Sequence, residues 1–144
     1  MELMKIAFAK PTLANAQTTI LEAVKLMAIE EADAIIITDA EKKVQGIFTE
    51  RDNMKRITLR ELDPRTTTLA QAMTAPVVTV TIAATVDEAL GLMFRNRFWH
   101  LPVVDAGHRA IGIVSARDLL MRRIGAKEAA LQTLEAYVMA GGPG

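Results

Sequence analysis

Hydrophobic positions along the chain show the same order of spacings twice. Apolar residues recur every three or four positions in the segments 20–27 and 86–94, a spacing typical of helices with one buried face. Each segment follows a threonine that stands three positions before a glutamate: Thr19 with Glu22, and Thr85 with Glu88. In such a capping box, the threonine oxygen and the glutamate carboxylate accept hydrogen bonds from backbone amides at the helix start. We therefore expect helices to begin directly after both threonines.

Short runs of β-branched and aliphatic residues follow both predicted helices. The runs 34–38 and 101–104 each precede a polar turn that begins with an aspartate. Further apolar runs, 44–49 and 110–115, come directly after those turns. Each pair of runs predicts two adjacent strands joined by a tight connection.

A short helix is predicted after each pair of strands, over 51–57 and over 117–124. Gly125 is expected to end the second of these helices as its C-cap. Beyond it, several apolar side chains fall on one face of a last helix, predicted over 126–139: Ala130, Leu134, Tyr137 and Val138. This face either packs on its own domain or contacts a second copy of the chain.

A shift of 66 positions places the second half of the chain on the first, without a gap from Thr18 to Arg56. The identical pairs include Glu22-Ala23 with Glu88-Ala89, Gly46-Ile47 with Gly112-Ile113, and Arg51-Asp52 with Arg117-Asp118. The predicted units are repeat 1 (5–57), a linker (58–68), repeat 2 (69–124) and the last helix. Each repeat has the order strand, helix, strand, strand, helix, which indicates an α/β fold of the α+β kind. Because the linker is short, we expect the repeats to pack together.

The composition narrows the range of functions. The 144 residues are 51% hydrophobic, and 17 lysines and arginines balance 17 aspartates and glutamates. Balanced charge provides no overall field for nucleic acid or an anionic membrane, so neither is an expected partner. No apolar run reaches membrane-spanning length, and the chain has no cysteine, which fits a reducing compartment and a cytoplasmic location.

The motifs near the ends of the repeats carry a family resemblance. The segment from Gly46 reads Gly-Ile-Phe-Thr-Glu-Arg-Asp, the segment from Gly112 reads Gly-Ile-Val-Ser-Ala-Arg-Asp, and the segment from His100 reads His-Leu-Pro-Val-Val-Asp. They resemble the signatures of CBS domains, and the whole chain resembles the small stand-alone proteins made of two CBS domains, a Bateman module. Repeat 1 departs from the pattern, because Ile36 replaces the proline. The resemblance implies a pseudo-twofold pair of repeats with two clefts between them, in a module that commonly forms homodimers.

Two aspartates are candidate ribose ligands within these motifs. Asp52 and Asp118 each offer a carboxylate that can accept two hydrogen bonds from a vicinal diol. Three positions earlier, Thr49 and Ser115 stand at a helix start, where a hydroxyl and free amides can hold a phosphate. The same spacing also fits simple capping boxes. Because both copies lie inside a recognised repeat, we favour ligand binding.

By analogy with the family, the opening of the first long helix, near Thr18, completes the cleft of Asp118. The matching position, Ala84, completes the cleft of Asp52. The expected Asp118 cleft gathers hydroxyl groups, a stacking surface and positive charge from Thr18, Trp99, His100, Ser115 and Arg117, with Arg95 and Arg97 nearby. Trp99 is equally suited to filling a core or an interface.

The two expected clefts differ in charge. The cleft of Asp52 carries further carboxylates at Glu31 and Asp33, which would repel a phosphate. We therefore expect tighter binding beside Asp118, and weak or no binding beside Asp52.

The expected function is that of a regulatory sensor that binds AMP, ADP, ATP or another adenosyl ligand and performs no catalysis. The basic residues near Asp118 favour a nucleotide over cationic S-adenosylmethionine. With two histidines, no cysteine and neither a glycine-rich phosphate loop nor a metal-spaced cluster, the sequence predicts no catalytic residue, no metal and no required cofactor. The alternative is a structural or dimerisation module whose clefts stay empty and which acts through protein partners.

Overall fold

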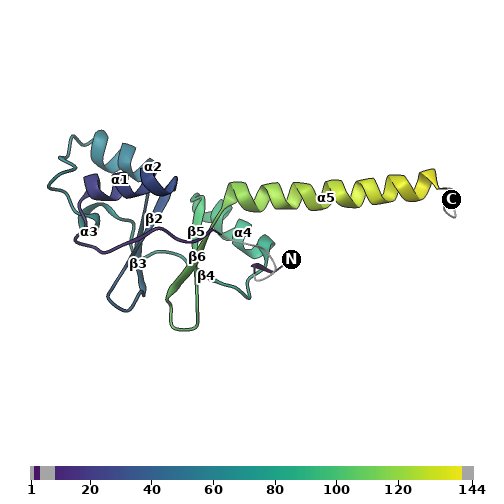
Figure 1. Ribbon diagram of the computed structural model, residues 1–144, viewed down its shortest axis with the longest axis horizontal. Helices are drawn as coiled ribbons and strands as arrows, with labels where there is room; N and C mark the ends of the chain where they lie inside the picture. The colour runs from purple at the N-terminus through teal and green to yellow at the C-terminus, as the bar shows by residue number, and fades with distance from the viewer. Residues whose placement is uncertain (1, 4–8, 141–144) are drawn as a thin grey trace.

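The computed structural model describes residues 2–3 and 9–140 as two similar units and one long helix (Figure 1). The first unit contains β1 (Leu13–Ala14), α1 (Ile20–Glu30), β2 (Ala34–Thr38), β3 (Val44–Thr49), α2 (Glu50–Asp52) and a π-helical turn, η2 (Asn53–Thr58). After the linker come α3 (Leu69–Ala72), β4 (Val80–Thr81), α4 (Val86–Asn96), β5 (His100–Val104), β6 (Ala110–Ser115) and α5 (Ala116–Met139). The mixed α/β class and the order of elements in each repeat are confirmed.

Each unit contains one three-stranded sheet, with the order β1-β2-β3 in the first and β4-β5-β6 in the second. The first two strands of each sheet are parallel and the last two are antiparallel. The registers correspond across the repeat, since Ile36 pairs with Ile47 in one sheet and Pro102 with Ile113 in the other. The shift of 66 positions in the sequence is therefore a structural repeat.

The predicted capping boxes form at both long helices. The Glu22 amide donates to Thr19 Oγ1 at 3.2 Å, and the Thr19 amide donates to Glu22 Oε2 at 3.1 Å. The same two bonds join Thr85 and Glu88 at 3.0 and 3.2 Å. Because these side chains satisfy amides that have no partner within the helix, the sequence fixes where α1 and α4 begin.

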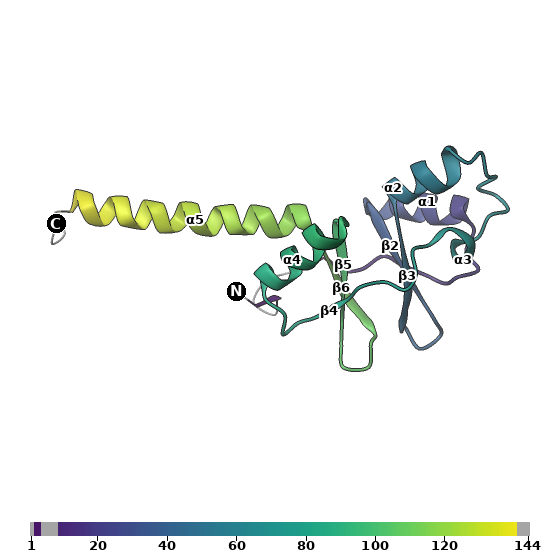
Figure 2. The same ribbon diagram turned by 180° about the vertical axis from the view of Figure 1, so that it is seen from behind.

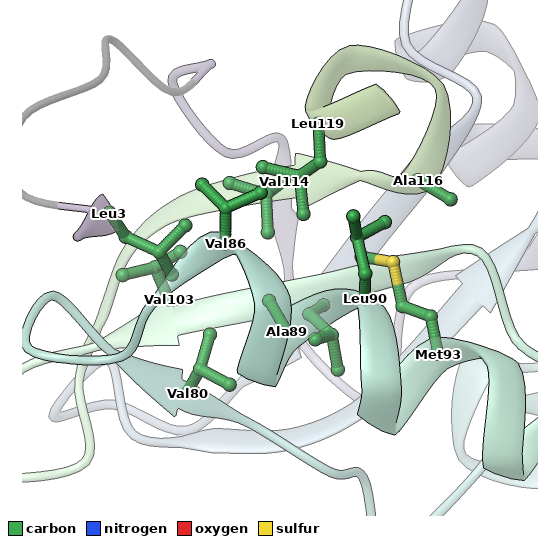
Figure 3. Close-up of a cluster of buried hydrophobic side chains, with 11 residues drawn as sticks. Leu3, Val80, Val86, Ala89, Leu90, Met93, Val103, Val114, Ala116 and Leu119 are labelled. Atoms are coloured by element: carbon green, nitrogen blue, oxygen red, sulfur yellow. The ribbon is translucent and has the colours of Figure 1, made fainter. Parts of the chain in front are cut away.

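Each unit has its own buried core, and each core includes a residue that lies outside that unit in the sequence. Leu3, near the N-terminus, is buried among Val86, Leu90 and other side chains of the second unit (Figure 3). Leu69 of α3 occupies the matching place in the first unit. The Leu3 amide donates to the Ala84 carbonyl and the Leu69 amide to the Thr18 carbonyl, both at 2.8 Å. This exchange of segments ties the two repeats into one body.

A third group of buried residues joins the two sheets. Ile36 and Val44 of the first unit pack with Val104 of the second. At the hairpin ends, the Val44 amide donates to the His108 carbonyl, and the Ala110 amide donates to the Lys42 carbonyl, each at 3.1 Å. The expectation that the repeats pack together is confirmed.

The end of the chain differs from the sequence prediction. Gly125 does not end a helix, because α5 runs without a break from Ala116 to Met139. A side chain at Gly125 would meet nothing within 4 Å, so no turn or close approach requires the glycine. Glycine within a helix costs about 1 kcal/mol relative to alanine, and the helix-forming residues on both sides offset that cost. The predicted last helix is thus the continuation of α5, and it leaves the body instead of packing on its own domain (Figure 2).

No helix among residues 2–3 and 9–140 combines the length and the apolar character that crossing a membrane requires.

Candidate functional site

A cavity of about 540 Å³ lies where three segments meet beside Asp52. One wall is the end of β3 and the start of α2, a second wall is the segment 74–78, and the third is the segment 96–100 of the second repeat. Thr49, Asp52, Thr74, Trp99 and His100 are among the residues that line it. The cavity therefore lies between the repeats.

The Asp52 carboxylate lines this cavity and is held in place by hydrogen bonds at the start of α2. Asp52 Oδ2 accepts a hydrogen bond from the Thr49 amide at 3.0 Å, and the Asp52 amide donates to Thr49 Oγ1 at 3.2 Å. The capping interpretation of this motif is therefore correct, whatever else the pair binds. Asp52 Oδ1 lies 3.7 Å from Arg56 Nε, and only 18% of the Asp52 side chain is exposed.

Arg56 links Asp52 to the chain that leads into the segment 74–78. One of its terminal guanidinium nitrogens, Nη1, donates to the carbonyls of Ala72 and Met73 at 3.0 and 2.9 Å. The same guanidinium faces Asp52 through Nε. The start of α2 and the chain leading into the segment 74–78 are thus held at a fixed distance.

The segment 74–78 runs close against β3. The Thr74 amide donates to the Ile47 carbonyl at 2.8 Å, and the Ile47 amide returns a bond to the Thr74 carbonyl at 3.1 Å. A β-carbon placed on Gly46 would stand 2.6 Å from Met73 Sδ and 3.0 Å from the Thr74 carbonyl oxygen. Glycine at position 46 of the Gly-Ile motif therefore leaves room for the backbone that crosses it, and any larger residue would have to displace that backbone or the Met73 side chain.

Sequence reasoning did not assign this wall to the site. The signal was present, because Pro76 lies in the wall and corresponds to Pro11 of repeat 1 at a shift of 65. A proline shared by two irregular segments indicates a constrained path for the backbone, which is where binding residues often lie.

Charged groups of both signs surround the cavity. The basic residues are Arg51, Lys55, Arg56 and Arg97, and the acidic residues are Asp33, Glu50 and Asp52. His100 Nε2 is buried and lies 3.1 Å from Asp33 Oδ1, off the direction of a hydrogen bond. Trp99 is 41% exposed, and its ring stands edge to face against Phe94 with centroids 6.0 Å apart. The cavity thus offers an aromatic surface close to cationic groups.

A second cavity, of about 460 Å³, lies beside Asp118. Its lining includes Ser115, Arg117 and Met121. The Asp118 amide donates to Ser115 Oγ at 3.1 Å, which caps α5, and the Asp118 side chain is exposed. Asp33, Trp99 and His100 line this cavity as well as the one beside Asp52.

The structure brings together some of the predicted site residues and separates others. Trp99, His100, Ser115 and Arg117 do lie with Asp118, but Trp99 and His100 also face Asp52. Thr18 is absent from the described linings of both cavities. Its carbonyl accepts a hydrogen bond from the Leu69 amide, and its hydroxyl donates to Asn15 Oδ1.

Ala84 likewise holds Leu3 through its carbonyl and does not line the Asp52 cavity. The expected distribution of charge also needs correction. Arg97, which the sequence places near Asp118, lines the cavity of Asp52, and so do three further basic side chains. Asp33 borders both cavities.

Within the described part of the chain, no three His, Cys, Asp or Glu side chains gather in a way that could hold a metal ion.

Comparison with known proteins gives a consistent result. The family model described as the CBS domain matches residues 4–57 and 69–125. An uncharacterised 17.7 kDa protein of Acidianus ambivalens is 36% identical over 115 residues, which are 80% of this chain and 68% of that protein. The chain spans only 20% of another relative, the inosine-5'-monophosphate dehydrogenase of Methanocaldococcus jannaschii, with 35% identity over 73% of this chain.

Solved structures match over most of the chain. A protein with CBS domains from Burkholderia ambifaria superposes with a TM-score of 0.76 and 31% identity, covering 85% of this chain and 91% of that one. The CBS domain pair of protein MJ0100 superposes with a TM-score of 0.77 and 28% identity, covering 88% and 98%. That pair was crystallised in complex with 5'-methylthioadenosine and S-adenosyl-L-methionine.

Proposed function

Because the chain belongs to the CBS domain family, whose paired domains are regulatory modules, we propose that it senses an adenosine-containing ligand. The ligand binds in the cavity beside Asp52, and the protein performs no catalysis on it. The observation that carries the proposal is the cavity itself, which lies between the repeats and is lined by a carboxylate, a hydroxyl group, an indole and several cations.

The size and chemistry of the cavity suit a nucleotide. A volume of about 540 Å³ is within the range of small-molecule sites, roughly 300 to 1,000 Å³. Asp52 is the ribose ligand, because one of its oxygens can still accept a hydroxyl hydrogen while the other caps α2. Trp99 offers an aromatic face to a base, and Arg51, Lys55 and Arg97 can neutralise phosphates.

The proposal reverses the order of affinities that the sequence suggested. Four basic side chains line the cavity of Asp52, whereas Arg117 is the basic side chain in the described lining beside Asp118. Asp33 borders both cavities and therefore does not distinguish them. An anionic ligand binds more tightly beside Asp52 for this reason, and the similarity to an adenosyl-binding pair supports the class of ligand.

Thermal unfolding with and without ligand tests the proposal. The panel consists of AMP, ADP, ATP, NADH, cyclic di-AMP and S-adenosylmethionine, each added to the wild type, to Asp52→Asn and to Asp118→Asn. A ligand at a hundred times its dissociation constant adds about 2.7 kcal/mol to the free energy of unfolding. We expect at least one of these adenosine compounds to stabilise the wild type, Asp52→Asn to lose most of that response, and Asp118→Asn to keep it.

Asparagine retains a side-chain oxygen that can accept the Thr49 amide, so the ligand-free melting temperature checks that the fold is intact. A wild type that responds to none of the six compounds would overturn the proposed function. A response lost only in Asp118→Asn would place the site in the other cavity.

A further inference from the structure

The side chains of α5 beyond Leu119 are exposed to solvent in a single chain. Leu119 is 1% exposed and is the last buried side chain of the helix, whereas every described residue from 120 to 140 is exposed. Figures 1 and 2 show the helix leaving the body in a straight line from two opposite views. One ion pair, between Arg123 Nη1 and Asp87 Oδ1 at 2.7 Å, ties the start of this segment to α4. Helices in proteins gain most of their stability from the packing of an apolar face, so the exposed apolar side chains of this segment call for a partner.

The apolar side chains of this segment follow a heptad pattern. Spacings of four and three positions relate Leu120, Ile124, Lys127, Leu131, Leu134 and Val138, and five of these six are apolar. The five apolar side chains are 37% to 65% exposed. A repeat of seven with apolar residues at two of its positions is the pattern of helices that pack side by side as coiled coils. The partner that fits this pattern is therefore another helix.

The charges along α5 indicate how that partner is oriented. The half from 116 to 127 contains Arg117, Arg122, Arg123 and Lys127 against Asp118, and the half from 128 to 139 contains Glu128 and Glu135 without a basic residue. Two copies of α5 in parallel would align halves of like charge. In antiparallel orientation, the basic half of each copy faces the acidic half of the other, and the helix dipoles also oppose each other.

We propose that two copies of this chain associate through an antiparallel pair of α5 helices. In the register that aligns the heptads, Leu120 faces Val138 of the partner subunit and Ile124 faces Leu134 of the partner subunit. Lys127 faces Leu131 of the partner subunit, so its aliphatic stem covers that leucine while its ammonium group reaches solvent. None of these six positions is in the described lining of either cavity, although Met121 next to them lines the cavity of Asp118. The proposal does not depend on ligand binding.

Sedimentation equilibrium of the full chain tests the association. We expect the wild type at tens of micromolar to have twice the 15.7 kDa mass of the chain. The double variant Leu131→Glu/Leu134→Glu should have the mass of one chain. The matched control, Ala129→Glu/Ala136→Glu, adds the same charge to the opposite face of α5 and should still associate. A wild type of single-chain mass, or a leucine double variant that still associates, would overturn the proposal.

The orientation is tested with single cysteines, which the natural chain lacks. In the antiparallel pair, the two copies of position 138 lie about 27 Å apart along the helix axis, whereas position 120 of one copy meets position 138 of the other. An equal mixture of Leu120→Cys and Val138→Cys should therefore give the mixed disulfide on mild oxidation. Val138→Cys alone should not cross-link. Efficient cross-linking of Val138→Cys with itself indicates a parallel pair and would overturn the proposed orientation.

Discussion

Replacing Gly46 by alanine tests how closely the segment 74–78 must approach β3. The new β-carbon would stand 2.6 Å from Met73 Sδ and 3.0 Å from the Thr74 carbonyl oxygen. The Met73 side chain can rotate away, but the carbonyl belongs to backbone that is hydrogen-bonded to Ile47 in both directions. The substitution therefore pushes the wall of the Asp52 cavity outward and stretches those two hydrogen bonds.

The expected change in the free energy of unfolding is the balance of two opposing effects. Overpacking of this kind usually costs about 1 to 3 kcal/mol, while removing a glycine from a strand returns roughly 0.5 to 1 kcal/mol. We expect Gly46→Ala to lower the free energy of unfolding by about 1 to 2 kcal/mol. At about 3 °C for each kcal/mol, the melting temperature should fall by roughly 3 to 6 °C.

Gly91→Ala is the matched control for this measurement. Gly91 lies in α4, and a β-carbon there would meet nothing within 4 Å. The same chemical change should therefore raise the stability of the protein by about 0.5 to 1 kcal/mol. Urea unfolding of both variants measures the difference, and hydrogen exchange at the Ile47 and Thr74 amides locates it. If Gly46→Ala proved as stable as Gly91→Ala, with both amides still protected, the close approach would not constrain this position.

Two further predictions follow from the backbone and the core. Arg97 has a left-handed backbone with φ of 57°, so Arg97→Gly should raise the free energy of unfolding by up to about 1 kcal/mol, and a loss of stability would contradict this. Because Arg97 also lines the Asp52 cavity, the same change should weaken the stabilisation by ATP in a thermal shift assay. Leu119→Ala should cost about 2 to 5 kcal/mol in urea unfolding, because the side chain is buried in the second core, whereas Leu134→Ala measured at sub-micromolar concentration should change stability by less than about 0.5 kcal/mol. Equal losses for the two leucines would show that the end of α5 packs within its own chain.

Local signals in the sequence were sufficient for most of the fold. The capping boxes at Thr19 and Thr85 fixed the starts of α1 and α4, because the bonds they predict join residues three positions apart. The strands β2, β3, β5 and β6 followed from their apolar runs, and the repeat predicted the same succession of elements in both units. The prediction of a C-cap at Gly125 was wrong, because a glycine ends a helix only where the backbone turns left-handed, and the neighbours of Gly125 favour continuation of the helix.

The composition of the clefts could not be predicted in the same way. The motifs correctly placed Thr49 beside Asp52 and Ser115 beside Asp118, because each pair lies within one helical turn. Which cleft a residue of the other repeat enters depends on how the two units pack, and no local spacing encodes that. His100 shows the difficulty, since it directly precedes the predicted strand 101–104, while its contact with Asp33, 67 positions earlier in the chain, arises only from the packing.

The three side chains shared by the two cavities would couple them if ligands occupied both. Asp33, Trp99 and His100 form part of both linings, so a ligand that moves Trp99 while entering one cavity also changes the surface that the other presents. Thermodynamic linkage makes this effect reciprocal: whatever factor a first ligand applies to the affinity of a second, the second applies to the first. With a ligand in each cavity, these shared side chains would make the response of the protein depend on the concentrations of both ligands.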